Sequence, residues 1–311
     1  MHKKGWRYYR DSIILWSLFF LVLATAGYAL RHPGYWIAVL LLWSIRHPIR
    51  NAFMFAHPFR RFGWMPESRL SFQEVTFKSR DGLTLFGRFV RSKNQATILL
   101  LHPLSSAGSH MLLYAEFLAS AGYGVLMVDL RAHGSSDGDT STYGWREADD
   151  VAGAVDYLLH RLDVNGQKIG VLGVSLGAQA ALRGALKTDC VRALVLEGLG
   201  PVTLSDHGGR PQSLQRWINY PFNWLYYRVY EFMIGGKDTS VTEAIGKIAP
   251  RPILLIASGK KDIHFNRLFF QAASEPKELW ELPDGEHGAA ILKDSHTYMQ
   301  RVIQFFDKAL L

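Results

Sequence analysis

The sequence predicts an α/β protein with a mainly parallel, doubly wound sheet, which follows a membrane-anchoring N-terminal segment. Two observations predict the sheet: short apolar runs recur along the chain, and helix-length stretches separate most of them. The third observation is that residues 1–70 contain two uncharged apolar runs flanked by basic residues. We therefore divide the chain into an anchor with a basic linker, residues 1–70, and a folded domain, residues 71–311.

The excess positive charge of the chain lies in the N-terminal segment. The whole chain has 35 Lys and Arg against 27 Asp and Glu, a net charge of +8. Residues 1–69 contain ten of these basic residues and two of the acidic ones, so the remainder is neutral. A nucleic-acid-binding protein would carry a basic patch on its folded domain, whereas basic residues beside apolar runs suit anionic lipid head groups. The sequence therefore predicts membrane lipids as partners and no nucleic acid.

The two apolar runs predict a transmembrane hairpin. Residues 13–30 form an uncharged run of 18, long enough to cross a hydrocarbon core. A turn containing Pro33 and Gly34 leads to the second run, residues 34–45. Basic residues at both outer ends predict that the folded domain is cytoplasmic. Two alternatives remain open: a cleaved signal peptide ending at the small residues Ala24 and Ala26, and one span followed by an interfacial segment.

The strands and helices of the folded domain are predicted from apolar runs and turn residues. Two β-rich runs, 72–77 and 83–90, flank Asp81-Gly82, which is a hairpin signal. Unbroken apolar runs, typical of strands covered on both faces, follow at 97–101, 125–130, 169–174, 193–196 and 253–257, with a last strand at 279–282. Helices are predicted at 109–121, 145–161, 176–187 and 296–309.

An aromatic insertion, residues 201–249, interrupts this alternation. Its apolar residues at spacings of three and four predict an amphipathic helix with one face made of Phe222, Leu225, Tyr226, Val229, Phe232 and Met233. Two interpretations remain open. These side chains either pack the insertion onto the main domain, or they cover an apolar pocket or contact lipid.

A candidate nucleophile lies between a predicted strand and a predicted helix. Gly173-Val174-Ser175-Leu176-Gly177 follows the run 169–174 and opens the helix 176–187. A serine on such a sharp turn has its Oγ lifted above the edge of the sheet. The helix N-terminus also offers free N–H groups to a developing oxyanion, and the N–H of Leu176 is the first candidate donor. The alternative is a glycine-rich turn without a chemical role.

A base and an acid are predicted on the loops after two later strands. Asp262 follows the strand 253–257, and His287 follows the strand 279–282. Their chain order, Ser175 then Asp262 then His287, is the order that a nucleophile elbow of this kind requires. His287 would take the serine proton and Asp262 would orient the imidazole. The alternatives are Asp284 for the acid and His264 or His296 for the base.

The loop after strand 97–101 predicts the second oxyanion donor. Pro103 has no N–H, so Leu104 is the candidate, and we interpret His102 as a residue that stabilises the loop. No zinc, P-loop or dinucleotide-binding pattern occurs, and the one cysteine, Cys190, cannot form a disulfide within the chain. We therefore expect no cofactor and no metal.

Residues 71–311 resemble the α/β-hydrolase superfamily, in the branch of single-domain esterases, monoacylglycerol-lipase-like and serine aminopeptidase-like proteins. The resemblance rests on His102-Pro103, the stretch 129–136, the stretch 173–177, Asp262 and the stretch 285–288. It implies the α/β-hydrolase fold with a helical cap at about 201–249, the three residues above as a catalytic triad, and Leu104 and Leu176 as oxyanion donors. Many relatives have His-Gly where this chain has His102-Pro103.

The resemblance also implies an activity. We expect hydrolysis of an apolar or lipid-derived carboxylic ester through an acyl-enzyme on Ser175. Cleavage of an amide, a thioester or a peptide by the same triad is the alternative. A catalytically inactive, membrane-bound binding protein is the third interpretation, which the intact set of nucleophile, base and acid disfavours.

Overall fold

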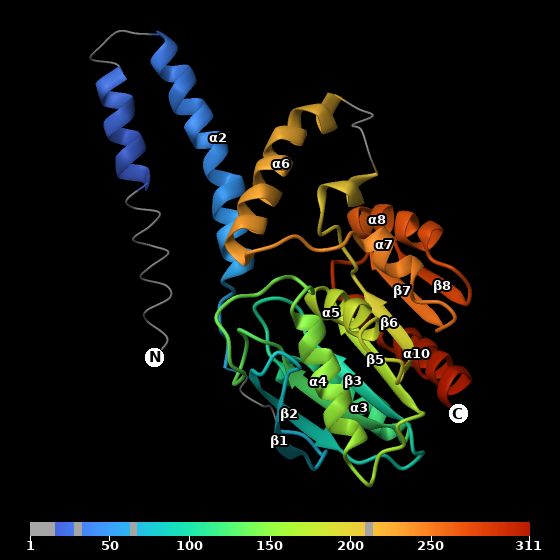
Figure 1. Ribbon diagram of the computed structural model, residues 1–311. Coiled ribbons are helices and arrows are strands. Elements are labelled where there is room, and N and C mark those ends of the chain that lie inside the picture. The colour runs from blue at the N-terminus through green and yellow to red at the C-terminus, as the bar shows by residue number, and fades with distance from the viewer. Residues whose placement is uncertain (1–15, 28–32, 63–66, 209–213) are drawn as a thin grey trace. The chain divides into compact units, whose positions relative to one another are not determined.

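The computed structural model describes residues 16–27, 33–62, 67–208 and 214–311. The chain forms two compact units (Figure 1). One comprises Met1–Met54 and Pro211–Met233, and the other comprises Phe55–Arg210 and Ile234–Leu311. The middle of the predicted insertion therefore groups with the N-terminal helices, and its two ends group with the α/β domain.

The described part of the first unit is mainly helical. Residues 16–27 form a helix, and α2 spans Pro33–Ala56. The two helices contact each other, because the rings of Phe20 and Trp43 are 5.2 Å apart and meet edge to face. Residues 13–15 and 28–30 of the first predicted apolar run lie outside the described residues.

The second apolar run, residues 34–45, is part of a longer helix than predicted. α2 continues through Arg46 and Arg50 to Ala56, so charged residues are included in it. Among the described residues, no helix combines the length and the apolar character that a membrane crossing requires. The described helices therefore do not support the predicted transmembrane hairpin.

The insertion contains the predicted helix, but its buried face differs from the predicted one. α6 spans Leu214–Ile234. Among its described side chains, the buried ones are Tyr227, Tyr230 and Ile234, at spacings of three and four. Phe232, which we predicted on the apolar face, is 86% exposed. The aromatic residues occur all round this helix, so their spacing did not define one face.

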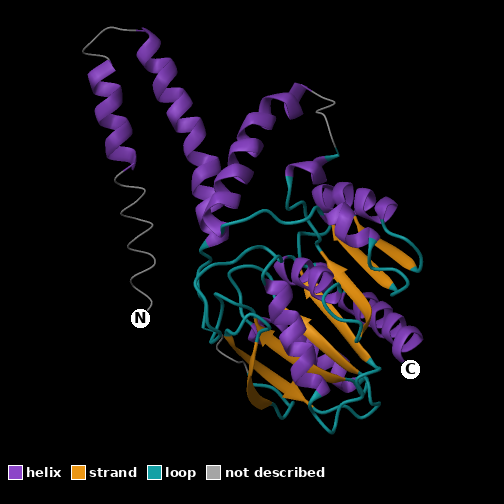
Figure 2. Cartoon of the chain, viewed as in Figure 1, coloured by secondary structure: helices purple, strands orange, loops and turns teal. Residues whose placement is uncertain are grey.

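The second unit contains a single eight-stranded sheet in the order β1-β2-β4-β3-β5-β6-β7-β8 (Figure 2). β1 and β2 form the predicted hairpin, with Gly82 at φ +97° in the turn, and β2 also pairs antiparallel with β4. All other pairs are parallel, which confirms the predicted mainly parallel sheet. The strands are β1 Gln73–Lys78, β2 Thr84–Val90, β3 Thr97–Leu101, β4 Gly124–Asp129, β5 Ile169–Val174, β6 Val191–Glu197, β7 Ile253–Ser258 and β8 Lys277–Leu282.

Helices cover both faces of this sheet. Alternate residues of β3 show the two layers: Leu99 and Leu101 pack with one apolar cluster, and Ile98 and Leu100 pack with the other. The first cluster includes buried residues of α4 Glu147–Leu159, α5 Leu176–Ala185, α7 Val241–Gly246 and α8 Gly259–Ala272. The second includes residues of α3 Leu112–Ser120, α9 Ala290–Lys293 and α10 Ser295–Leu310. Because both faces are covered, the central strands are apolar throughout, as predicted.

The structure differs from the prediction in several helical segments of this unit. The predicted helix 109–121 consists of a 3₁₀ turn, η1 Gly108–Met111, followed by α3. A second 3₁₀ turn, η2 Leu204–His207, precedes α6. The segment after β7 was predicted as a loop, but α8 begins directly at Gly259. Gly259 has φ +80°, a conformation that lets the chain turn from strand to helix without connecting residues.

Candidate active site

Ser175 lies on the sharp turn between β5 and α5. Its backbone has φ +53° and ψ −110°, a combination that a non-glycine residue adopts only under strain. The N–H of Ser175 donates to the carbonyl of Glu197 at the end of β6 (2.8 Å), which holds the turn against the neighbouring strand. The side chain therefore stands at the carboxyl edge of the parallel sheet.

Two glycines make this turn possible. A Cβ on Gly173 would lie 2.2 Å from the carbonyl oxygen of Gly177, and a Cβ on Gly177 would lie 2.1 Å from the carbonyl oxygen of Leu101. Both neighbours are backbone atoms and cannot move aside. The close approach of α5 to β3 and β5 thus depends on the absence of side chains at both positions.

His287 contacts both Ser175, which lies 112 positions before it, and Asp262, which lies 25 positions before it. Nε2 of His287 is 3.0 Å from Oγ of Ser175, and Nδ1 is 2.8 and 3.0 Å from the two carboxylate oxygens of Asp262. A carboxylate only accepts, so Nδ1–H donates to Asp262 and Nε2 is left to accept the serine proton. The structure thus brings together all three residues that the sequence singled out.

Asp262 comes from a helix and not from a loop, which corrects the prediction. It lies in the first turn of α8 and is buried. Its backbone carbonyl accepts a hydrogen bond from Nδ2 of Asn266 (2.9 Å), which also donates to the carbonyl of Leu199 after β6 (2.9 Å). Asn266 therefore ties the backbone at Asp262 to the segment that follows β6.

The electrostatics of the pair favour a protonated imidazole. The hydrogen bond to the Asp262 carboxylate raises the pKa of His287 above its usual value, and this effect exceeds the opposing effect of burial. A base with a raised pKa holds the serine proton more readily once it has taken it.

The two predicted oxyanion donors follow neighbouring strands of the sheet, β3 and β5. β3 and β5 are paired in parallel, with Leu101 opposite Gly173, so the turn with Leu104 and the turn with Ser175 leave the same edge. Leu176 is the first residue of α5, where backbone N–H groups have no acceptor within the helix. Their role as donors remains a prediction.

Two buried histidines hold the loop after β3. Nε2 of His102 accepts from the N–H of Leu130 (3.1 Å), and Nε2 of His133 accepts from the N–H of Ser105 (3.0 Å). Burial lowers the pKa of His102 to about 3 and also lowers the pKa of His133, so both rings are neutral. His102 thus has the loop-stabilising position that we predicted. Because the N–H of Ser105 donates to His133, it is not available to bind a substrate oxyanion.

Sequence reasoning missed a tyrosine next to the nucleophile. The hydroxyl of Tyr143 is 3.5 Å from Oγ of Ser175. Tyr143 lies in the loop before α4, 32 positions before the serine, in a stretch without a recognised motif. Its positive φ of +51° is a structural signal of a constrained position, and no feature of the sequence alone indicates it.

The site has no neighbouring metal cluster within the described residues. In the part of the chain that the structure describes, no group of three or more His, Cys, Asp or Glu side chains is arranged to hold a metal ion.

Known proteins are similar to this chain in sequence and in fold. The model of the family described as "Alpha/beta hydrolase family" matches residues 98–300. The uncharacterized protein YfhR of Escherichia coli (strain K12) is 30% identical over 260 residues, which cover 77% of this chain and 82% of YfhR. The uncharacterized protein YqkD of Bacillus subtilis is 28% identical over 227 residues, covering 68% and 71% of the two chains. The structure of the Pyrococcus furiosus esterase PF2001 matches with a TM-score of 0.68 and 26% identity, over 83% of this chain and 99% of that one.

Proposed function

The chain belongs to the alpha/beta hydrolase family, and from this premise we propose that it is a serine hydrolase that cleaves carboxylic esters through an acyl-enzyme on Ser175. One observation carries the proposal: Asp262, His287 and Ser175 form a continuous hydrogen-bonded chain at the carboxyl edge of the sheet. Hydroxyl, imidazole and carboxylate in this order are the parts that convert a weak nucleophile into a reactive one.

The proposed reaction has two steps. In the first, Oγ of Ser175 attacks the ester carbonyl while His287 takes its proton, and His287 then passes that proton to the leaving alcohol. In the second, water attacks the acyl-enzyme with His287 as base, and the acid is released. Asp262 keeps the ring in the required tautomer and stabilises the imidazolium. The N–H groups of Leu104 and Leu176 would bind the oxyanion in both steps.

We propose ester hydrolysis over amide, thioester or peptide hydrolysis because the Pyrococcus furiosus protein, 26% identical and matched over 99% of its own chain, is named an esterase. The triad itself acts on all of these groups, since they pass through the same tetrahedral intermediate. An inactive binding protein would have no need of the hydrogen-bonded Ser175, His287 and Asp262.

We further propose that residues 1–70 hold the enzyme at a membrane, with the catalytic domain on the cytoplasmic side. Exposed large apolar side chains are concentrated on the helix 16–27 and on α2, where Leu21, Val22, Ile37 and Leu40 are each at least 60% exposed. Such a surface is unusual for a protein surrounded by water. Apolar substrates that partition into lipid would then reach the enzyme at that surface.

The ester proposal is tested by comparing matched substrates. We expect the purified full chain to hydrolyse p-nitrophenyl esters, with decanoate preferred to acetate, and to act more slowly on the corresponding anilides and thioesters. Ser175→Ala should lower kcat by about 10⁶-fold. A wild-type protein that cleaves the anilide faster than the ester would contradict the ester preference, and equal activity of S175A would contradict the assigned nucleophile.

The membrane proposal has its own test. The full chain should float with vesicles of phosphatidylglycerol and phosphatidylcholine in a density gradient, and a reporter fused after Leu311 should be active in the cytoplasm. Recovery of the protein at the bottom of the gradient would contradict membrane attachment. A reporter active on the opposite side of the membrane would contradict the orientation.

A further inference from the structure

The loop between β4 and α4 brings a phenol to the reacting oxygen. The Tyr143 hydroxyl is 3.5 Å from Oγ of Ser175. Its ring is half-buried and lies against the ring of Phe55, with centroids 5.4 Å apart. Burial raises the pKa of Tyr143 above its usual value, so the hydroxyl keeps its proton at neutral pH.

The proton of each hydroxyl can be assigned from its partners. The Ser175 hydroxyl donates to Nε2 of His287, because Nδ1–H of that ring is committed to Asp262. The Tyr143 hydroxyl is therefore the donor between the two oxygens. At 3.5 Å it is beyond the usual O–H···O distance, so it binds the resting serine weakly. A hydrogen-bond donor that stabilises a tetrahedral intermediate should bind the charged oxygens of that intermediate more strongly than it binds the resting serine hydroxyl.

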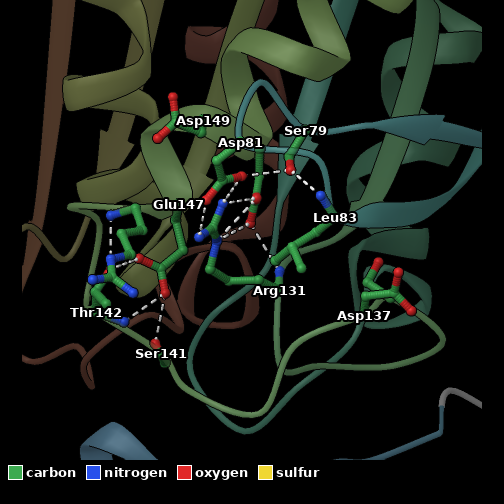
Figure 3. Close-up of polar contacts among 12 residues, drawn as sticks. Ser79, Asp81, Leu83, Arg131, Asp137, Ser141, Thr142, Glu147 and Asp149 are labelled. Atoms are coloured by element: carbon green, nitrogen blue, oxygen red, sulfur yellow. Dashed lines mark hydrogen bonds and ion pairs between the residues drawn. The ribbon is translucent and has the colours of Figure 1, made fainter. Parts of the chain in front are cut away.

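A buried carboxylate fixes the loop that carries this tyrosine. Glu147, in the first turn of α4, is fully buried and binds residues on both sides of Tyr143 (Figure 3). It accepts hydrogen bonds from Ser141 Oγ at 2.8 Å, Thr142 N–H at 2.9 Å, Thr142 Oγ1 at 2.6 Å and Gly144 N–H at 2.9 Å.

These bonds hold the backbone in a conformation that it would not adopt alone. Tyr143 has φ +51° and Gly144 has φ +111°. A Cβ at position 144 would lie 2.6 Å from Cβ of Gln179 in α5, so the loop is pressed against the helix that follows the nucleophile. Strain of this kind persists only where the surroundings enforce it, and the Glu147 carboxylate is the enforcing group.

We propose that Tyr143 is a catalytic residue whose hydroxyl donates a hydrogen bond to the tetrahedral intermediate on Ser175, and that Glu147 is the positioning residue for it. The inference rests on the proposed function. As Oγ forms its bond to the carbonyl carbon, the serine proton goes to His287 and negative charge develops on the carbonyl oxygen. Tyr143 keeps its proton throughout and shares it with this oxygen. When the intermediate collapses, the bond to the leaving group breaks and His287 returns the proton to that group.

The role of Tyr143 is tested by a substitution that removes only its hydroxyl group. Tyr143→Phe should lower kcat about 100-fold and leave KM nearly unchanged, since the bond forms in the transition state. The matched control is Tyr157→Phe in α4. The Tyr157 hydroxyl accepts a hydrogen bond from Nη1 of Arg161 (2.7 Å) and so belongs to a different hydrogen-bond network. Y157F should have wild-type kcat. A Y143F enzyme with wild-type kcat would overturn the inference.

The test of Glu147 is a double-mutant cycle. Glu147→Gln should lower kcat with KM unchanged, and the Y143F/E147Q double variant should be no slower than the slower single variant. Losses that multiply would show that Glu147 acts independently of Tyr143, and would overturn its positioning role. If E147Q does not fold, Thr142→Val provides the same cycle, because it removes one hydroxyl donor to the carboxylate.

The outcomes separate this inference from the proposed function. If the folded wild type neither hydrolyses esters nor reacts with a fluorophosphonate, the proposed function is wrong. If the wild type does both and Y143F matches it, only the role of Tyr143 is wrong.

Discussion

Replacing Arg131 by methionine should destabilise the α/β domain by about 3–5 kcal/mol at neutral pH. The guanidinium is almost fully buried and lies between two carboxylates (Figure 3). Nη1 and Nη2 bind the Asp81 oxygens at 2.8 Å each, and Nη2 also binds Asp150 at 2.7 Å. Asp150 has no exposed side-chain surface, so Arg131→Met leaves a buried carboxyl group without its partner.

The expected loss depends on pH, and its sign follows from Asp150. Burial raises the pKa of Asp150 to about 7 even with Arg131 beside it, and removal of the cation raises it further. A folded-state pKa above that of the unfolded chain means that stability falls as the pH rises through the folded value. The difference in unfolding free energy between wild type and R131M should therefore be larger at pH 8 than at pH 5.

Urea unfolding followed by circular dichroism at both pH values measures this difference. The matched control is Arg80→Met, because Arg80 pairs with Asp156 (2.8 Å) while both side chains are more than a third exposed. R80M should lose at most about 1 kcal/mol. The variant R131M/Asp150→Asn should lose clearly less than R131M, since it carries no unpaired charge at position 150. An R131M protein within about 1 kcal/mol of wild type at pH 8 would refute the reasoning.

Two further predictions concern the site. Asp262→Asn should lower kcat roughly 10⁴-fold and move the acid limb of the kcat/KM profile to lower pH, because the pKa of His287 falls when its carboxylate partner is lost; an unchanged acid limb would contradict this. Gly177→Ala should lower the rate of fluorophosphonate labelling by about 100-fold or more, because its Cβ would lie 2.1 Å from the Leu101 carbonyl and must displace α5. Gly246→Ala, whose Cβ would meet its nearest atom at an ordinary 3.4 Å, is the control and should label at the wild-type rate.

Much of the sheet could be predicted because its central strands are covered on both faces and are apolar without interruption. The hairpin was equally clear, since Asp81-Gly82 is a turn signal between two β-rich runs. The start of α8 was missed because its first residues are polar, a composition typical of a loop. In the structure, the positive φ of Gly259 lets the strand and the helix join directly. The prediction of the buried face of α6 was wrong because aromatic residues occur on all sides of that helix.

The three residues of the proposed triad could be selected because the order and the place of each at a strand end follow from the fold. Tyr143 could not be selected in this way. Its approach to Ser175 depends on a backbone conformation that Glu147 imposes through four hydrogen bonds, and such a tertiary constraint leaves no local pattern in the sequence.

The central claim is that the hydroxyl at position 175 is the nucleophile, and covalent trapping tests it most directly. The full chain is treated with a fluorophosphonate, digested and analysed by peptide mass spectrometry. We predict a single phosphonylated peptide with the adduct on Ser175, formed much more slowly in His287→Ala. An adduct on another residue, or no adduct on a protein whose circular dichroism shows it to be folded, would contradict the account.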